Sequence, residues 1–316
     1  MVKIINPEDD KRLNPISALR YIELNRFKVE RFLDERVRKE DRYFVLKEML
    51  KNPVALAYII KNNYEYDERR RIKIVVDKIT REGTITVMLG AKRHGKSSTS
   101  VWLLEYIHKH YPDKKLYWIG YSEAIEKYYP YVNQTINLVE PDENSFVVFD
   151  EASLFLFSRD AMSKQSKEKI KELPTLGHRG ASVLFISQSA QMVDIDIFLL
   201  CDFIWFKPFF AVDFDERLNI PTYLKYILPK NKNENLVYDM HEQFFYVFKN
   251  PLPSIWNDEL SKPYSKIKTK EKAQEFLGGL LKMGFDEKTI DTILKIRGWS
   301  LEQLLEEDSL RHKKKR

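Results

Sequence analysis

Short apolar runs alternate with amphipathic segments from residue 84 onward, and this alternation predicts strands separated by helices. The strand candidates are residues 84–89, 115–119, 135–139, 145–149, 182–186 and 202–206. Helices are expected at residues 96–109, 161–172 and 194–200. Residues 236–249 suit a hairpin that turns near His241 and Glu242. The order of these elements predicts an α/β fold with a mainly parallel sheet.

The chain on both sides of this α/β region has a helical pattern. Helical segments are expected at residues 29–50, 53–61, 67–79, 270–282, 287–296 and 301–307. Residues 251–265 contain three prolines and are expected to form an extended tether. We therefore divide the chain into a helical N-terminal region at 1–83, a core at 84–265 and a small helical C-terminal module with a basic tail at 266–316.

Charge is distributed unevenly along the 316 residues. Residues 1–83 carry 20 basic and 15 acidic groups and residues 261–316 carry 14 and 9, whereas the middle carries 19 and 23. Basic flanks suit a polyanion such as nucleic acid, and a mixed-charge helical surface is the alternative. The one cysteine, Cys201, excludes an internal disulfide framework. With no apolar leader and no apolar run long enough to cross a bilayer, we expect a cytoplasmic protein.

The strongest chemical signal follows the first predicted strand. Residues 90–97 match G-x-x-x-x-G-K-[S/T] between a strand and a helix, which is the Walker A context. Lys96 is expected to neutralise β- and γ-phosphate oxygens, and the Ser97 hydroxyl to bind Mg²⁺. The residues expected to hold the nucleotide are Gly90, Ala91, Lys92, Arg93, His94, Gly95, Lys96, Ser97 and Ser98. The alternative is an ordinary strand–turn–helix corner.

A second signal is the carboxylate pair Asp150 and Glu151, which comes directly after the apolar run 146–149. Ligands gather at the carboxyl edge of a parallel sheet, where a Walker B element would place such a pair. Asp150 is expected to hold Mg²⁺, and Glu151 to polarise the attacking water as a catalytic residue. A solvated loop is the alternative reading of the pair.

A third apolar run, 183–186, leads to Ser187 and Gln188. The Gln188 amide would orient the water or contact the γ-phosphate, unless it is only a polar strand end. An acidic pair combined with a polar sensor strand is typical of the ASCE class of P-loop NTPases, which inserts an extra strand between the Walker A and Walker B strands. The chain has no N-K-x-D guanine motif, so ATP is favoured over GTP.

The run His178-Arg179-Gly180, followed by Ser187-Gln188 and Asp194, resembles the FtsK/HerA superfamily of DNA-pumping ATPases. It is similar to viral genome-packaging and zonula-occludens-toxin-like ATPases over roughly residues 84–265. The resemblance implies a RecA-like core that binds ATP and Mg²⁺, and homo-oligomeric rings, commonly hexamers. It also implies an arginine donated across the subunit boundary, for which Arg179 matches best and Arg159 is the reserve. The chain lacks the transmembrane segment expected of the toxin-like export ATPases.

These signals predict an ATP-driven translocase of double-stranded DNA that packages a viral genome. A viral portal, capsid or membrane protein would be its docking partner, in the host cytoplasm or the virion. Lys164, Lys167 and Lys171, which follow the Walker B pair, are candidate DNA contacts, with a solvated helix face as the alternative.

Two rival functions stay open. In the first, an AAA+-type ATPase remodels protein, residues 266–316 form its lid and Arg297 touches the γ-phosphate. In the second, nucleotide binding without turnover orders a scaffold or switch. The C-terminal module, around residues 281–285 and 298–301, resembles three-helix modules of either helix-turn-helix or UBA-like type.

Overall fold

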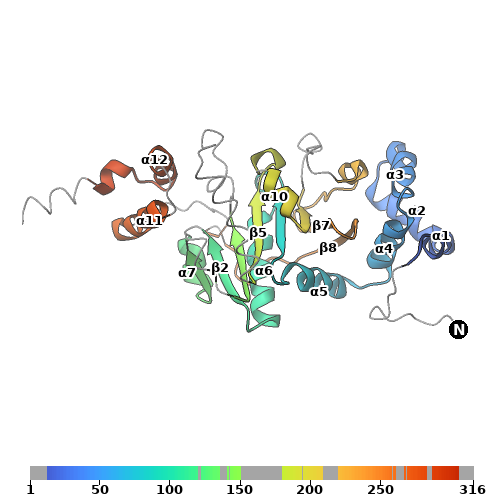
Figure 1. The fold of residues 1–316 in the computed structure, drawn as a ribbon, viewed down its shortest axis with the longest axis horizontal. Helices are drawn as coiled ribbons and strands as arrows, with labels where there is room; N and C mark the ends of the chain where they lie inside the picture. Colours follow the sequence, from blue (N-terminus) through green and yellow to red (C-terminus); the bar gives the residue numbers. More distant parts are fainter. Residues whose placement is uncertain are drawn as a thin grey trace, which may run out of the picture.

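A sheet of eight strands forms the centre of the computed structural model, in the order β3-β2-β4-β5-β1-β6-β7-β8 (Figure 1). The strands are β1 (Ile85–Leu89), β2 (Lys115–Ile119), β3 (Val132–Thr135), β4 (Ser145–Phe149), β5 (Ser182–Ser187), β6 (Phe203–Phe206), β7 (Glu234–Asp239) and β8 (Phe244–Lys249). The structure describes residues 13–119, 122–135, 141, 143–150, 180–193, 195–208, 220–257, 259–260, 267, 269–282 and 287–305.

Neighbouring strands are parallel from β3 through to β6, whereas β7 pairs antiparallel with both β6 and β8. Strand β1 lies between β5 and β6, so β5 separates it from β4. This inserted strand is the one expected between the Walker A and Walker B strands. The α/β fold with a mainly parallel sheet and the ASCE strand order are therefore confirmed.

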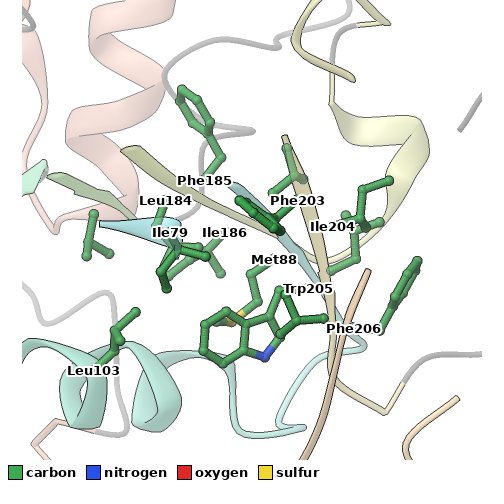
Figure 2. Packing of buried hydrophobic residues seen from close by; sticks show 14 of the residues in the cluster. Ile79, Met88, Leu103, Leu184, Phe185, Ile186, Phe203, Ile204, Trp205 and Phe206 are labelled. Carbon is green, nitrogen blue, oxygen red and sulfur yellow. The ribbon is translucent and has the colours of Figure 1, made fainter. Parts of the chain in front are cut away.

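The central strands are buried along their whole length: every residue of β1 and of β4 is buried. A strand that is covered on both faces needs a continuous apolar run rather than an alternating one, which explains their sequences. Helices α5 (Glu68–Ile79) and α6 (Lys96–His110) contribute to the same core through Ile79 and Leu103. Figure 2 shows these two side chains with apolar residues of the sheet, among them Met88, Leu184, Phe185, Ile204 and Trp205.

The N-terminal helices pack beside the β8 edge of the sheet (Figure 1). They are α1 (Pro15–Leu24), α2 (Arg26–Arg36), α3 (Arg42–Met49) and α4 (Pro53–Tyr64). Tyr58 of α4 stacks on Phe244 of β8, with ring centroids 5.3 Å apart. The helical segment expected at 29–50 is divided in two, because α2 ends before the extended backbone of Val37.

The C-terminal helices α11 (Lys270–Lys282) and α12 (Glu287–Ile296) lie at the opposite end of the sheet, near α7 (Glu123–Tyr128) (Figure 1). Lys272 of α11 reaches Glu126 of α7, with Nζ 2.7 Å from Oε2. The indole of Trp299 donates to the Ile267 carbonyl oxygen at 2.6 Å and so ties the end of the module to its start. The bounds predicted for these two helices are confirmed.

The remaining predictions of strands and helices are confirmed only in part. The hairpin is confirmed as β7 and β8, and the helix expected at 194–200 is α10 (Ile195–Leu200). The third strand begins earlier than predicted, since β3 covers Val132–Thr135 and the prediction began at residue 135. Residues 136–140 and the expected helix 161–172 lie outside the described residues. Cys201 is buried, and burial raises the pKa of its thiol to about 12. Among the described residues, no helix combines the length and hydropathy that crossing a membrane requires.

Candidate active site

Three adjacent parallel strands end at one cavity of about 720 Å³. Strand β1 leads to the loop that precedes α6, β4 leads directly to Asp150, and β5 leads to Gln188. The cavity is lined by Lys92, Arg93, His94, Gly95, Lys96, Ser97, Ser98, Asp150, Gln188, Lys232, Asn233, Asn250, Leu252 and Trp256. Its volume falls in the range of small-molecule sites. The structure therefore brings together the described parts of all three sequence signals.

One side of this cavity, which we call the phosphate wall, consists of residues 92–98, Asp150 and Gln188. Gly95 has φ +83° and forms the N-cap of α6, a conformation in which glycine avoids the penalty of a side chain. Arg93 also has a positive φ of 63°. The loop thus opens directly into the N-terminus of a 15-residue helix, whose free N–H groups and partial positive charge favour phosphate oxygens.

The Lys96 side chain is folded back onto its own loop. Its ammonium donates to the carbonyl oxygens of Gly90 at 2.6 Å and Ala91 at 3.0 Å, and the residue is buried. Gly90 and Ala91 therefore act in this structure by positioning the lysine, while the residues from Lys92 onward line the cavity. An ammonium held beside the cavity can neutralise phosphate oxygens in a site shielded from water.

Ser97 and Asp150 fit the predicted magnesium site. Both line the phosphate wall, and hydroxyl and carboxylate oxygens are the ligands that Mg²⁺ prefers. Among the described residues there is no cluster of three or more His, Cys, Asp or Glu side chains that could hold a metal. Mg²⁺ is usually bound by one or two protein groups together with substrate phosphates and waters, and Ser97 and Asp150 could be two such groups.

The remaining part of the lining, which we call the hairpin wall, consists of Lys232, Asn233, Asn250, Leu252 and Trp256. These residues flank the β7–β8 hairpin: the first two precede β7, and the others follow β8. The two walls touch at Gly95, where an added Cβ would lie 2.7 Å from the Lys232 carbonyl oxygen. Glycine is thus required at this position for close approach as well as for its φ angle.

A buried polar network lies behind both walls. Lys207, the residue after β6, donates to Asn235 Oδ1 at 3.0 Å, and the Trp205 indole donates to the same oxygen at 3.0 Å. The Asn235 amide donates to Asn250 Oδ1 at 2.9 Å, which also accepts from the Thr99 hydroxyl at 3.2 Å. Since Thr99 is on α6, this network joins the helix that begins at the phosphate loop to the hairpin.

Lys207 also touches the phosphate loop itself. A Cβ on Gly90 would lie 2.6 Å from the Lys207 Cβ, so this glycine is needed for the loop to pass over the lysine. The Lys207 side chain is fully buried, and that burial lowers the pKa of its ammonium to about 7. The carboxylate of Glu234, a residue of β7, raises the pKa of Lys207 but does not cancel the effect of burial.

Several residues that the sequence predicts for the site cannot be placed relative to the cavity. Glu151, Arg179, Arg159 and the segment 164–171 lie outside the described residues. Arg297, the lid candidate, is described: its guanidinium lies over the Phe276 ring of α11, 5.6 Å from the centroid, and it is not among the residues that line the cavity.

Sequence reasoning missed the hairpin wall and Lys207. Lys207 could have been found by the logic that selected Asp150 and Gln188, because it too follows an apolar strand of the parallel sheet. The hairpin wall has no such signal. Residues 251–265 were expected to be a tether, yet Leu252 and Trp256 from this segment line the cavity.

Together, the strand order and the glycine-rich loop between β1 and α6 define the fold of a P-loop NTPase of the ASCE class. No family model matches the chain, and no curated protein does either.

Three solved structures are similar to parts of this chain. The DNA-packaging ATPase B204 from Sulfolobus turreted icosahedral virus has a TM-score of 0.41 and 16% identity, over 54% of this chain and 98% of that one. The N-terminal domain of zonular occludens toxin from Neisseria meningitidis has 0.35 and 16%, over 57% and 97%. ATPases 2 and 3 of EssC from Geobacillus thermodenitrificans have 0.41 and 12%, over 69% and 45%.

Proposed function

We propose that this chain binds ATP with Mg²⁺, hydrolyses it and uses the hydrolysis to move double-stranded DNA. The observation that carries the proposal is the convergence of the phosphate loop, Asp150 and Gln188 at the carboxyl ends of three adjacent parallel strands. An NTPase needs a cation, an acidic metal ligand and a polar group near the γ-phosphate at one place. Here separate parts of the sequence supply all three to one cavity.

Four residues of the phosphate wall, together with Glu151 and Arg179, have roles in this proposal. The Lys96 ammonium leaves the carbonyl oxygens of its loop and holds the β- and γ-phosphates. Ser97 and Asp150 hold Mg²⁺, which when bound neutralises charge on the phosphate oxygens. Glu151 accepts a proton from the attacking water, and Gln188 orients that water or the γ-phosphate. Arg179 from a neighbouring copy completes the site in trans.

The DNA part of the proposal is supported by the sequence resemblance and by the basic flanks of the chain. In a ring, which we propose to be a hexamer, Lys164, Lys167 and Lys171 would contact the phosphate backbone of the duplex. The proposed setting is the packaging of a viral genome in the host cytoplasm, with docking to a portal, capsid or membrane protein.

The test is an ATPase assay with and without duplex DNA, run alongside a measurement of particle size. We expect DNA to stimulate turnover in an assembled ring, and the stimulation to fall steeply with salt because bound Lys and Arg release phosphate counterions. Alanine at Lys164, Lys167 and Lys171 should lower the stimulation while basal turnover is kept. A ring that turns ATP over at low salt but never responds to DNA would contradict the translocase and favour a protein-remodelling ATPase.

The position of Arg297 bears on that rival. A lid arginine that senses the γ-phosphate has to reach the nucleotide cavity. Arg297 is buried inside the C-terminal module, where its guanidinium lies over Phe276 and its backbone carbonyl accepts from Ile267. This placement gives the AAA+ reading no support in the described structure.

A further inference from the structure

The lining of the cavity is mostly polar but includes two large apolar side chains. Among its described lining residues, Leu252 and Trp256 alone carry large apolar side chains; the rest are charged, polar or small. Leu252 is 66% exposed, although burial of a leucine is favourable, and Trp256 is half-buried. An exposed leucine and a tryptophan that line the same polar cavity form a suitable surface for an apolar, flat group.

The segment that carries these side chains, residues 251–256, is tied to the phosphate-loop helix. Glu105 of α6 accepts from the Ser254 backbone N–H at 2.9 Å and from the Ser254 hydroxyl at 2.6 Å. The Tyr129 hydroxyl donates to the Ile255 carbonyl oxygen at 2.7 Å and lies 2.9 Å from Glu105 Oε1. Hydrogen bonds to a carboxylate are among the stronger ones, so α6 holds this segment and the phosphate loop at a fixed separation.

Nearby polar groups are already engaged. Asn250 Oδ1 accepts from Thr99 and Asn235, and the Asn250 amide donates to the Pro251 carbonyl oxygen at 2.7 Å. Residues 231–234 read N-K-N-E, which differs from the N-K-x-D guanine motif only in having glutamate in place of aspartate. Glu234, however, accepts from the backbone N–H groups of Lys230 and Asn231 and does not line the cavity. Glu234 is therefore not placed to read the edge of a base.

We propose that residues 251–256 form the nucleobase wall of the cavity and that Leu252 and Trp256 contact the face of a purine base. This inference rests on the proposed function only in requiring that the ligand is a nucleoside triphosphate. The phosphates lie on the phosphate wall, and the base lies against Leu252 and Trp256, whose segment is hydrogen-bonded to Glu105 through Ser254. Since every base has a π-face, this contact gives affinity without selecting adenine over guanine.

The test compares ligands with and without a base on the full chain. Isothermal titration calorimetry would use a non-hydrolysable ATP analogue, the GTP analogue and inorganic tripolyphosphate. Trp256→Ala should weaken both nucleotide analogues by about 10- to 100-fold, the loss expected for one base–aromatic stack, and leave tripolyphosphate unchanged. Trp256→Phe should retain most of the affinity, because a smaller aromatic face is still present.

Leu252→Ala offers a second variant at an exposed position that folding does not depend on. It should weaken both nucleotide analogues and spare tripolyphosphate, while Leu199→Ala, an exposed leucine of α10 that does not line the cavity, should change nothing. Unchanged nucleotide affinity in both Trp256→Ala and Leu252→Ala would overturn the nucleobase wall. Equal weakening of tripolyphosphate would overturn it as well, since the loss would then have nothing to do with the base.

These outcomes are separable from a failure of the proposed function. A wild-type chain that binds the analogues through Trp256 but never turns ATP over contradicts the hydrolysis and supports the nucleobase wall. A chain that turns ATP over with the same KM in wild type, Trp256→Ala and Leu252→Ala supports the hydrolysis and contradicts the nucleobase wall.

Discussion

The two walls of the cavity are built in different ways. The phosphate wall comes from the carboxyl ends of parallel strands, and most of it is one continuous stretch, residues 92–98. The hairpin wall flanks two antiparallel strands at one edge of the sheet, and its residues lie more than a hundred positions after residues 92–98. The first wall offers charge for phosphates, and the second supplies the two large apolar side chains of the lining, Leu252 and Trp256. Most of the phosphate wall is thus local in sequence, whereas only tertiary structure brings the hairpin wall to it.

The largest expected effect tests whether one chain supplies every catalytic residue of the active site. Arg179→Ala should lower turnover by about 10³- to 10⁵-fold if the arginine acts on a neighbour's γ-phosphate. Mixing Arg179→Ala subunits with Lys96→Ala subunits should restore activity, because some interfaces then combine an intact phosphate loop with an intact arginine. Demonstrated co-assembly without recovered activity would show that the arginine does not act in trans.

The next effect separates the two carboxylates that follow β4. Glu151→Gln should keep nucleotide and Mg²⁺ binding while turnover falls by about 10²- to 10⁴-fold, as for the loss of a positioned base. Asp150→Asn should instead shift the Mg²⁺ dependence of turnover to higher concentrations. Metal titrations of ATPase activity check both, and identical titration curves for the two variants would mean that the roles are wrongly assigned.

The contact between the walls is tested by Gly95→Ala. The substitution places a side chain at φ +83° and a Cβ 2.7 Å from the Lys232 carbonyl oxygen, so the loop and the hairpin must separate. We expect nucleotide affinity to fall by about 10- to 100-fold, equivalent to about 1.4–2.8 kcal/mol, as measured by calorimetry.

Gly278→Ala provides the matched control for this substitution. Gly278 lies in α11 with no atom within 4 Å of an added Cβ, so alanine there should leave nucleotide affinity unchanged. It should raise the free energy of unfolding by about 0.5–1 kcal/mol, because alanine is the better helix former. Equal affinity in Gly95→Ala and wild type would mean that the two walls do not depend on each other.

The smallest effect concerns the network behind the walls and appears as a pH dependence of stability. In the unfolded chain the pKa of Lys207 is 10.5, whereas in the folded protein it is about 7. Between these values the unfolded state binds more protons, so this residue makes stability rise with pH, by at most about 1.4 kcal/mol per pH unit. Lys207→Met should flatten that rise in denaturant unfolding from pH 7 to 9. Lys249→Met, at an exposed position on β8, should retain it, and parallel curves for wild type and Lys207→Met would contradict the assignment.

Much of the sheet was predictable because its central strands are buried on both faces and read as apolar runs between polar segments. Strand β4 and the Asp150 that follows it are one such case. The phosphate wall was predictable because a strand, a glycine-rich turn and a helix start are adjacent in sequence. The division of 29–50 into two helices was not predicted, because the composition favours a helix throughout, whereas α2 ends at the extended Val37 and both α2 and α3 pack against α4.

The hairpin wall could not be predicted for a related reason. Nothing near Leu252 or Trp256 in the sequence shows that Glu105, about 150 positions earlier, ties their segment to α6. The proline-rich composition of this segment says nothing about where the segment lies. Such contacts are long-range in sequence, so they become visible only when the sheet has brought both parts together.

The central claim is that the loop before α6 holds the triphosphate of a nucleotide that the protein hydrolyses. The most direct measurement is phosphate release from ATP and Mg²⁺ by wild type and by Lys96→Ala, prepared in the same way. The account predicts turnover in wild type and a loss of at least about 10²-fold in the variant, because the β- and γ-phosphate charge is left uncompensated. Near-normal turnover in Lys96→Ala would contradict the assignment of the active site.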